Sequence, residues 1–406
     1  MVLPLWIITE NVDMAKWFVA AKRADFQKIG ETFGISPVLA RIIRNRDIVE
    51  EDDIRKYLQG TVEEMYDPGL LLGMECAVEI LERKIRENKQ IRIIGDYDAD
   101  GICSTFILHK GLLHAGALAD TAIPHRMKDG YGLNEHLVED AWEAGVDTII
   151  TCDNGIAAAP QIELAKKKGM TVIVTVPYEE SVGERRYLMP PADVVIDPKQ
   201  EGDNYPYKGI CGAVVAYKVI MSLFRRLGLE KRESALLEEL LELAAFATVC
   251  DVMELLDENR IIVKFGLSHM QSTVNQGLRA LMEVNGIDKK KLSAYHIGFV
   301  MGPCLNATGR LDTAVRALQL LEAEDRGEAV RIAADLKQLN DSRKEMTDIF
   351  VKKAVKLVEE SGLGKDRVLV VYLPDCHESL AGIIAGRVRE KYYKPVFVLT
   401  KGEEGV

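Results

Sequence analysis

Short β-branched runs alternate with amphipathic helical patterns between about residues 75 and 200. Strands are expected at 91–94, 146–151, 171–175 and 194–196, and helices at 76–88, 102–115, 134–144 and 157–168. Each crossover helix returns the chain in the same direction, so this order predicts a doubly wound α/β domain with a mainly parallel sheet. Functional sites in such sheets form where loops leave the carboxyl ends of the strands.

Acidic side chains follow two of the expected strands. Asp96, Asp98 and Asp100 occupy alternate positions after the first strand, and Asp153 follows the strand at 146–151. Like charges this close destabilise one another unless a cation neutralises them, and carboxylate oxygens favour Mg²⁺ or Mn²⁺. The pattern therefore predicts a metal site, and the alternative for residues 96–100 is a solvated acidic loop.

A further acid lies within an apolar segment. Asp251 is surrounded by Val249, Cys250, Val252 and Met253, directly after a helical pattern rich in leucine and alanine. An acid among apolar residues is costly unless it is paired or bound to a metal, so Asp251 is another candidate ligand. A helix cap or a partner in a buried salt bridge explains it equally well.

Residues 297–310 combine two early glycines and a proline with Asn306 and Arg310. This composition predicts a bent backbone that approaches another group closely. Arginine favours bidentate hydrogen bonding to a phosphate, so Asn306 and Arg310 are candidate substrate-binding residues. The alternative is a glycine-rich turn that carries a surface arginine.

The last part of the chain begins a second α/β pattern. A long helical pattern at 326–360 is followed by an expected strand at 368–372, a helix at 380–391 and a strand at 396–400. The predicted domains are a helical cap (1–72), the first α/β domain (73–265), a helical connector (266–362) and an incomplete second α/β domain (363–406). The long helix without internal Pro or Gly is expected to act as a stiff connection.

Composition narrows the class of protein. Of the 406 residues, 48% are hydrophobic and 28% are charged, which is typical of globular domains, and no apolar run is long enough for a membrane helix. A cytoplasmic location is therefore expected. The seven cysteines are scattered without a CxxC pair, which favours reduced, buried thiols over a zinc site or disulfides. The net charge of −11 opposes a surface that coats nucleic acid, but it leaves room for a local basic groove.

Eight segments occur together in a characteristic order. They are Gly95–Gly101 (Gly-Asp-Tyr-Asp-Ala-Asp-Gly), Gly130–Gly132, Asp153–Gly155, Pro190–Asp193 with Asp197–Lys199, Cys211–Ala213, Asp251–Met253, Leu305–Arg310, and His377–Glu378 with Gly382–Ile383. In these segments the chain resembles the RecJ family of single-stranded-DNA-specific exonucleases, in the DHH phosphoesterase superfamily. A single such segment is weak support, whereas eight in register are specific.

The resemblance implies a two-metal phosphodiesterase that uses Mn²⁺ or Mg²⁺ to degrade single-stranded DNA from its 5′ end, in DNA repair and recombination. It implies that Asp96, Asp98, Asp153 and Asp251 bind the metals and that Asp100 supports the same loop. Asn306 and Arg310 would hold the substrate phosphate, and His377, in a DHHA1-like second domain, would lie near the scissile phosphate. The expected partners are single-stranded DNA and a single-strand-binding protein or helicase, and the expected state is a monomer without membrane attachment.

The sequence departs from the family in two places. After Thr175 the family has Asp-His-His, whereas here Val176-Pro-Tyr-Glu179 follows, and no histidine lies between His136 and His269. This absence predicts a chain that is nearly inactive as a nuclease. The alternatives are a non-catalytic DNA-binding relative and a phosphodiesterase for short oligonucleotides or cyclic dinucleotides.

The second departure lies at residue 406. The family continues to a Gly-Ser-Gly-Arg-Ser stretch and usually to an OB-fold, so weaker DNA grip and an exposed sheet edge are expected here.

Overall fold

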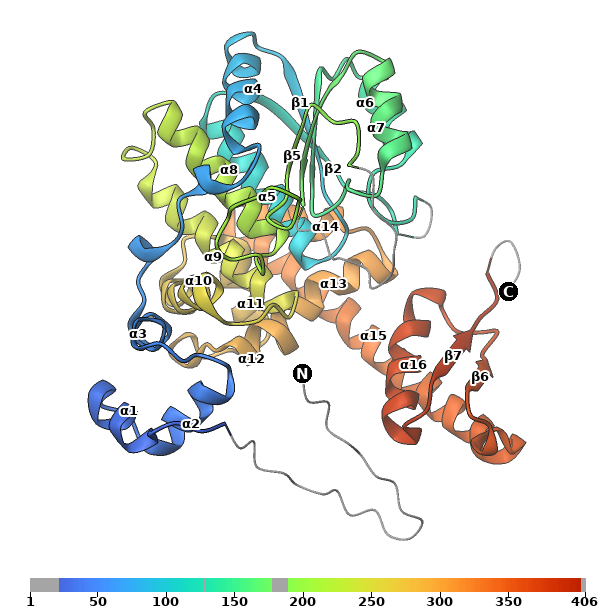
Figure 1. Ribbon diagram of the computed structural model, residues 1–406. Coiled ribbons are helices and arrows are strands. Elements are labelled where there is room, and N and C mark those ends of the chain that lie inside the picture. Colours follow the sequence, from blue (N-terminus) through green and yellow to red (C-terminus); the bar gives the residue numbers. More distant parts are fainter. Residues whose placement is uncertain (1–21, 127–128, 177–188, 403–406) are drawn as a thin grey trace. The chain divides into compact units, whose positions relative to one another are not determined.

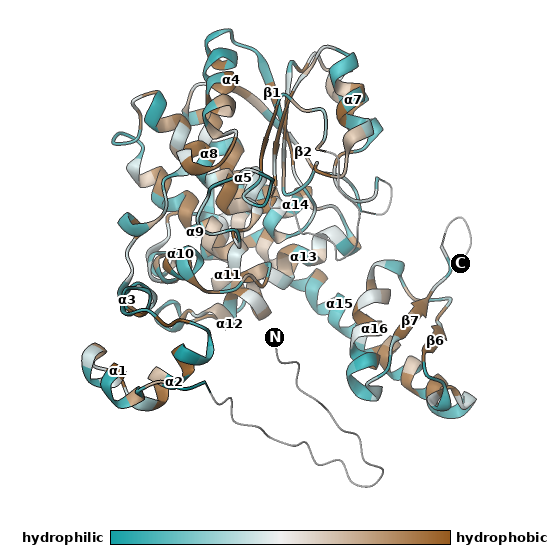
Figure 2. Cartoon of the chain, viewed as in Figure 1, coloured by the Kyte–Doolittle hydropathy of each residue, from teal (hydrophilic) through white to brown (hydrophobic). Residues whose placement is uncertain are grey.

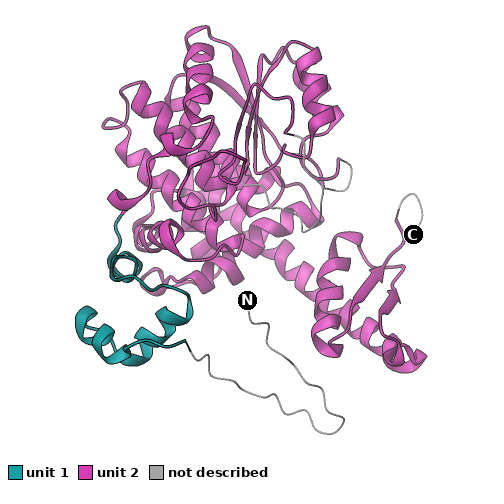
Figure 3. Ribbon diagram, in the orientation of Figure 1, with its two compact units in different colours: residues 1–61 teal, residues 62–406 magenta. Residues whose placement is uncertain are grey.

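The computed structural model describes residues 22–126, 129–176 and 189–402. The chain divides into two compact units, one up to Thr61 and one from Val62 onward (Figure 3). The smaller unit contains α1 (Phe26–Phe33), α2 (Pro37–Asn45) and α3 (Glu51–Gln59). Its first two helices begin at side-chain caps, because Asp25 accepts a hydrogen bond from the Lys28 N–H and Ser36 accepts one from the Leu39 N–H.

The larger unit is built on a five-stranded parallel sheet (Figure 1). Its strands, in the spatial order β2-β1-β3-β4-β5, are β1 (Gln90–Ile94), β2 (Leu118–Ala122), β3 (Thr148–Cys152), β4 (Thr171–Thr175) and β5 (Val194–Ile196). The helices along this part of the chain are α4 (Met74–Arg86), α5 (Ala99–His114), α6 (Glu135–Glu143), α7 (Ala159–Lys167) and α8 (Gly212–Arg226). The predicted doubly wound, mainly parallel sheet is confirmed, with the addition of β2, which was not predicted.

Helices dominate the chain after the sheet. They are α9 (Ser234–Cys250), α10 (Asp257–His269), α11 (Gln276–Val284), α12 (Ala294–His296), the π-helix η5 (Ile297–Met301), α13 (Gly302–Leu311), α14 (Val315–Glu322) and α15 (Arg326–Ser361). Short 3₁₀ helices lie at η1 (Val62–Glu64), η2 (Pro68–Leu70), η3 (Met270–Ser272), η4 (Lys289–Lys291) and η6 (Leu363–Lys365). The long helical pattern predicted at 326–360 is therefore one continuous helix.

The predicted bend at residues 297–310 is wrong, because η5 and α13 run through this segment as continuous helix. Gly302 and Pro303 are the first two residues of α13 and directly follow the π-helix η5. Gly302 is needed for packing, since a Cβ at this position would lie 2.4 Å from the Cys250 sulfur. Gly302 therefore allows close contact with helix α9, and the glycines in this segment do not form a turn.

The two faces of the sheet are buried by different helices. Ile91 and Ile93 of β1 join a large core with α5, α8 and α9, whereas Ile94 joins a smaller core with α6 and α7. This alternation follows from the two-residue period of a strand. Figure 2 shows the strands as predominantly hydrophobic, as expected for a sheet covered on both faces.

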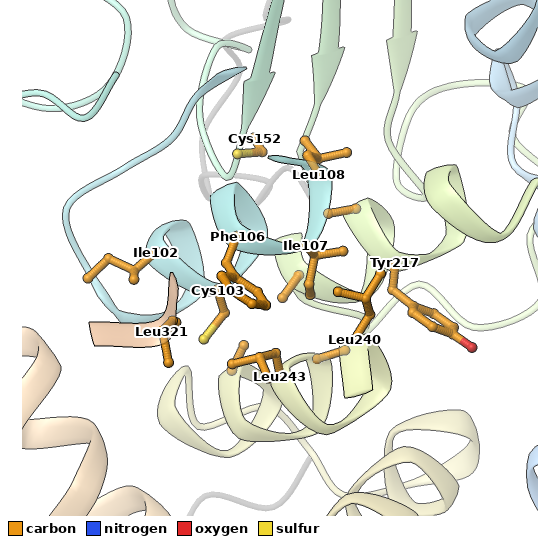
Figure 4. Close-up of a cluster of buried hydrophobic side chains, with 14 of the residues drawn as sticks. Ile102, Cys103, Phe106, Ile107, Leu108, Cys152, Tyr217, Leu240, Leu243 and Leu321 are labelled. Atoms are coloured by element: carbon orange, nitrogen blue, oxygen red, sulfur yellow. The ribbon is translucent and has the colours of Figure 1, made fainter. Parts of the chain in front are cut away.

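Helix α5 is the central helix of the larger core. It is apolar nearly all round, as expected of a helix buried on every side. Ile102 and Phe106 of α5 lie close to Leu243 of α9 and Leu321 of α14 in Figure 4. The first turn of α5 carries Asp98 and Asp100, so this packing fixes where those carboxylates lie.

A second, smaller sheet forms from β6 (Leu369–Tyr372) and β7 (Val396–Leu399), which are parallel and connected through α16 (Glu378–Tyr392). Leu369, Val371, Leu380 and Ile384 share a core with Ala354 and Val358 of α15. The predicted second α/β pattern is therefore present.

All seven cysteines are free, and five are buried. The expectation of burial is wrong for Cys76, which lies on the exposed side of the amphipathic helix α4, and Cys250 is only partly covered. Among the described residues, no helix combines the length and apolar character needed to cross a bilayer.

Candidate functional site

Three of the predicted acids meet at the carboxyl end of the sheet. Asp96, Asp98 and Asp153 each offer a carboxylate oxygen, and the three oxygens lie within 4.8 Å of one another. They converge because β1 and β3 are adjacent parallel strands, with Ile94 opposite Thr151, and both loops leave the same edge. The sequence prediction that these acids gather at one place is supported by this geometry.

Asp98 and Asp100, in the loop after β1 and the first turn of α5, make different contacts. Asp98 is the N-cap of α5, and its Oδ1 accepts hydrogen bonds of 3.0 Å from the N–H groups of Asp100 and Gly101. Asp100 is buried, and both its oxygens accept hydrogen bonds at the start of α8, from Gly212 N–H at 2.7 Å and Ala213 N–H at 2.8 Å. Asp100 therefore anchors the start of α8 through charge-assisted hydrogen bonds. Each of its carboxylate oxygens already accepts a hydrogen bond, so neither faces the carboxylate cluster without a donor.

The Asp153-Asn154-Gly155 turn is held by its own side chains. Asn154 donates hydrogen bonds to the carbonyl oxygens of Ile94 (3.0 Å) and Cys152 (2.9 Å), so it ties the ends of β1 and β3 together. Asp153 has φ of 58°, a left-handed conformation that is uncommon outside glycine. Such strain is typical of functional positions, and here it directs a carboxylate toward the loop after β1.

The cluster is electrostatically unfavourable without a cation. Burial, followed by the negative charge of Asp98, raises the pKa of Asp96 to about 7. Burial and the neighbouring Asp100 raise the pKa of Asp153 well above its usual range. The Oδ1 atom of Asp96 is buried and has no hydrogen-bond partner. Clustered carboxylate oxygens with an unused buried acceptor fit a hard divalent cation.

A cavity of about 500 Å³ opens beside the cluster. Asp98, Asp153 and Asp251 contribute carboxylates to its wall, and Lys199 and Val176 line it as well. Asp251 is exposed and lies at the C-cap of α9, so the expected cost of burial and the buried-salt-bridge alternative are wrong. The cap alternative is correct about its position and is compatible with a role as a ligand. The cavity thus brings the three sequence segments with candidate ligands to one place.

The point where Asp-His-His is missing lies at this cavity. The Asp153 N–H donates a 3.0 Å hydrogen bond to the Thr175 carbonyl, and Val176 is buried in the cavity wall. A buried apolar side chain therefore follows β4 directly, at the point in the chain where the family has Asp-His-His. Pro177 to Glu179 lie outside the described residues.

A second cavity, of about 250 Å³, adjoins the first and shares Asp98 and Tyr131 with it. Its wall also contains Asp96, Tyr97, Arg126, Asn306 and Arg310. Asn306 fixes the metal-site loop, because its Oδ1 accepts a 2.8 Å hydrogen bond from the Ala99 N–H. Burial, then repulsion from Arg126 and Arg343, lowers the pKa of Arg310, and a bound anion would relieve that repulsion.

The structure connects Arg310 to His377 through a residue that was not predicted. Arg310 donates a 2.9 Å hydrogen bond to the Ser379 carbonyl, and the Ser379 hydroxyl donates one of 3.0 Å to the Arg310 carbonyl. The same hydroxyl lies 2.7 Å from Nδ1 of His377, which is the exposed N-cap of α16. Ser379 thereby joins α13 to the second α/β sheet. No local pattern marks it, because its partner lies 69 residues away in the sequence.

Tyr131, Lys199 and Arg126 also line the two cavities, and no role was predicted for them. The Tyr131 hydroxyl donates a 2.9 Å hydrogen bond to the Asp153 carbonyl, and its ring packs edge-on against Tyr97 with centroids 6.2 Å apart. Lys199 adds a cation to a wall that is otherwise rich in carboxylates. The flanking glycines at 130 and 132 and the Asp-Pro-Lys segment were the available signals.

Gly212 offers a test of the cluster's geometry. A Cβ at this position would lie 2.9 Å from the Asp153 Cβ and 3.0 Å from its Oδ1. Gly212→Ala should displace the Asp153 carboxylate and weaken Mn²⁺ binding by about 10-fold, the scale at which disturbed ligand support acts, with an unchanged circular dichroism spectrum. Gly386→Ala is the matched control, because a Cβ there meets no atom within 4 Å. Equal Mn²⁺ affinity in both variants would contradict the assignment of Asp153 as a ligand.

Fold and site together define an α/β domain with a carboxylate cluster at the ends of parallel strands, and comparison with known proteins gives its class. The model of the DHH family, N-terminal domain, matches residues 90–248. The chain is 34% identical over 390 residues to the single-stranded-DNA-specific exonuclease RecJ of Bacillus subtilis, covering 96% of this chain and 48% of the relative.

Solved structures agree with this class. A crystal structure of exonuclease RecJ bound to manganese is 32% identical, with a TM-score of 0.73, over 81% of this chain and 80% of that one. RecJ from Thermus thermophilus in complex with Mn²⁺ is 29% identical, with a TM-score of 0.77, over 92% of this chain and 52% of that one. The chain belongs to the RecJ family of DHH proteins. It spans about half the length of the Bacillus relative.

Proposed function

We propose that this chain is the core of a metal-dependent phosphodiesterase of single-stranded DNA, directed at the 5′ end in DNA repair or recombination, with little turnover because the Asp-His-His segment is absent. The carrying observation is the convergence of Asp96, Asp98 and Asp153 within 4.8 Å, beside a cavity that also contains Asp251. The RecJ relatives are named single-stranded-DNA-specific exonucleases, and two RecJ structures contain manganese. Mn²⁺ or Mg²⁺ is accordingly the proposed cofactor.

Each residue has a role in this proposal. Asp96, Asp98, Asp153 and Asp251 hold the cations, which when bound would stabilise charge on the phosphate and lower the pKa of a bound water. Asp100 is a positioning residue, because it fixes the start of α8 against the cluster.

The neighbouring cavity supplies the contacts to substrate. The Arg310 guanidinium binds the substrate phosphate, and Asn306 holds the Asp98 loop in register with it. Ser379 keeps His377 beside Arg310, so the second α/β sheet contributes to the same substrate.

A non-catalytic relative is the second candidate, and Val176 favours it. This buried valine directly follows Thr175, after which the family has Asp-His-His, and the sequence has no histidine between His136 and His269. The four remaining aspartates favour metal binding in either case. The third candidate is a phosphodiesterase for short oligonucleotides or cyclic dinucleotides. Comparing the rates of hydrolysis of a dinucleotide and of a long oligonucleotide distinguishes it from the proposed exonuclease.

Binding measurements test the proposal without depending on turnover. The chain should bind Mn²⁺ by electron paramagnetic resonance, and Asp98→Asn should lose most of this binding. It should also bind 5′-phosphorylated single-stranded DNA, and Arg310→Ala should weaken the DNA affinity by about 10- to 100-fold, as for a lost charge-assisted hydrogen bond, without changing Mn²⁺ affinity. Arg310→Lys should fall between, because it keeps the charge and loses the two-pronged geometry. A chain that binds no Mn²⁺ would refute the proposal.

The domain plan and partners are also proposals. The divisions at 72, 265 and 362 follow from the sequence pattern. The DHHA1-like character of residues 363–406, the monomeric state, and a single-strand-binding protein or helicase as partner follow from the resemblance.

A further inference from the structure

Two exposed aromatic rings stack on each other in the helical region after the sheet. Tyr295 and Phe299 are 63% and 70% exposed, and their ring centroids lie 5.3 Å apart with 24° between the planes. They stand one helical turn apart, on α12 and η5. Large aromatic surface exposed in this way has an unfavourable hydration free energy and marks a contact site.

The helix that carries the aromatic pair is seated against the end of α9. A Cβ on Gly302 would lie 2.4 Å from the Cys250 sulfur, and one on Gly298 would lie 3.5 Å from Cγ1 of Val249. Because Val249 and Cys250 directly precede Asp251, the aromatic pair lies beside the segment that enters the carboxylate cavity. The helix that carries the pair therefore packs against the residues that lead into the proposed site.

The next residue after Asp251 extends the apolar surface. Val252 is 87% exposed and has φ of 56°, a left-handed conformation that is an outlier for a β-branched side chain. The left-handed backbone of Val252 ends α9, because the Val252 N–H donates to the Val249 carbonyl at 3.2 Å and the Met253 N–H donates to the Thr248 carbonyl at 3.1 Å. This turn places an exposed apolar side chain next to a candidate metal ligand.

Positive charge lies next to the aromatic pair along the chain. Lys289, Lys290 and Lys291 form η4 and are all exposed, and Leu292 and Ser293 alone separate them from α12. In a chain with net charge −11, a run of three exposed cations gives local attraction for a polyanion. Aromatic rings beside cations are the combination that binds single strands without sequence preference.

We propose that Tyr295 and Phe299 form a base-stacking platform for single-stranded nucleic acid, with Lys289–Lys291 contacting its phosphates and Val252 leading the strand toward the carboxylate cavity. This inference rests on the proposed function and adds a contact surface for the same substrate. A duplex keeps its bases stacked internally, so the platform selects single strands.

Fluorescence anisotropy in EDTA tests the platform, using a labelled oligothymidylate and an abasic strand of equal length and charge. The unmodified chain should prefer the oligothymidylate. The Tyr295→Ala, Phe299→Ala double variant should lose about 10- to 100-fold in affinity for it, the range of lost stacking contacts, and little for the abasic strand. A Tyr295→Phe, Phe299→Tyr variant should retain the preference.

Trp142→Ala is the matched control and should bind both strands as the unmodified chain does. Trp142 is also an exposed aromatic beside a lysine, since the Lys168 ammonium lies 4.0 Å from its ring centroid, but it stands at the amino ends of the strands. If the unmodified chain binds no oligothymidylate, the proposed function fails, and the platform with it. If it binds and the double variant binds equally well, the platform alone is refuted. An equal loss on both strands with a lower thermal midpoint would show that the pair is a packing surface, which also overturns the inference.

Discussion

Insertion of Asp-His-His and one further residue between Thr175 and Val176 should raise the rate of Mn²⁺-dependent hydrolysis of 5′-phosphorylated single-stranded DNA by roughly 100-fold or more. Loss of residues that merely orient metal ligands typically costs 10- to 100-fold, and an absent ligand is at least as severe. The unaltered chain should therefore be nearly inactive. Release of nucleotides from a labelled oligonucleotide is the measurement.

The position of the insertion explains the expected gain. Thr175 is the last residue of β4, and its carbonyl accepts a hydrogen bond from the N–H of Asp153, one of the clustered acids. Val176 already lines the cavity that contains Asp98, Asp153 and Asp251. New ligands inserted after Thr175 enter that cavity, and the sheet itself needs no change.

The control is an insertion of equal length with Asp-Ala-Ala and the same further residue, which restores the loop without its imidazoles. It should recover only a small part of the rate. Equal recovery by both insertions would show that loop length, and not a histidine ligand, limits the chain. Rapid hydrolysis by the unaltered chain would show that four aspartates suffice, and the prediction would then be wrong.

How far the sequence predicted the fold depended on local composition. The strands β1, β3 and β4 are β-branched and buried, so their pattern was clear. Strand β2 was not predicted because Leu118-Ala-Asp-Thr-Ala122 is an edge strand with no residue fully buried and no run of large apolar side chains. Its position is set by pairing with β1, which no local signal contains.

The sequence predicted which acids form the candidate site, but it did not predict the different role of each acid. Asp96, Asp98 and Asp100 look equivalent at alternate positions, yet Asp100 turns to the start of α8, whose sequence lies 112 residues away. Likewise, Ser379 acquires its role only through contact with Arg310 across 69 residues. The type of metal ligand can be predicted from the residues themselves. Contacts between residues that are far apart in the sequence cannot, because only the fold brings them together.

The stability of the metal-free protein should rise as the pH falls from about 8 to about 5. Burial and the charge of Asp98 raise the pKa values of Asp96 to about 7 and of Asp100 to about 6, above the usual value of 3.8. In this window the folded state binds protons that the unfolded state does not, so protonation favours folding. Each pK unit corresponds to about 1.4 kcal/mol, so the effect amounts to a few kcal/mol at most, since other carboxylates share the charge.

Acids whose pKa is lowered by ion pairs do not cancel this trend. The pKa of Asp147 is lowered by hydrogen bonds from Lys84 and Thr148, although burial opposes the shift. Its contribution to stability is fully present above the unfolded pKa and is lost only as the pH falls below about 4, outside the window. The thermal midpoint in EDTA, followed by circular dichroism, should therefore increase steadily between pH 8 and pH 5.

Excess Mn²⁺ should reverse the sign of this dependence. Metal binds the deprotonated carboxylates and stabilises only the folded state, so its contribution is largest at high pH and disappears as Asp96 and its neighbours are protonated. The Asp96→Asn variant removes one of these groups with a raised pKa. In EDTA at pH 8 its thermal midpoint should be higher than that of the unmodified chain. This midpoint should also depend less on pH and should rise less when Mn²⁺ is added. If the thermal midpoint of the unmodified chain falls on acidification in EDTA, or if Mn²⁺ stabilises both proteins equally, Asp96 is neither a strained acid nor a metal ligand.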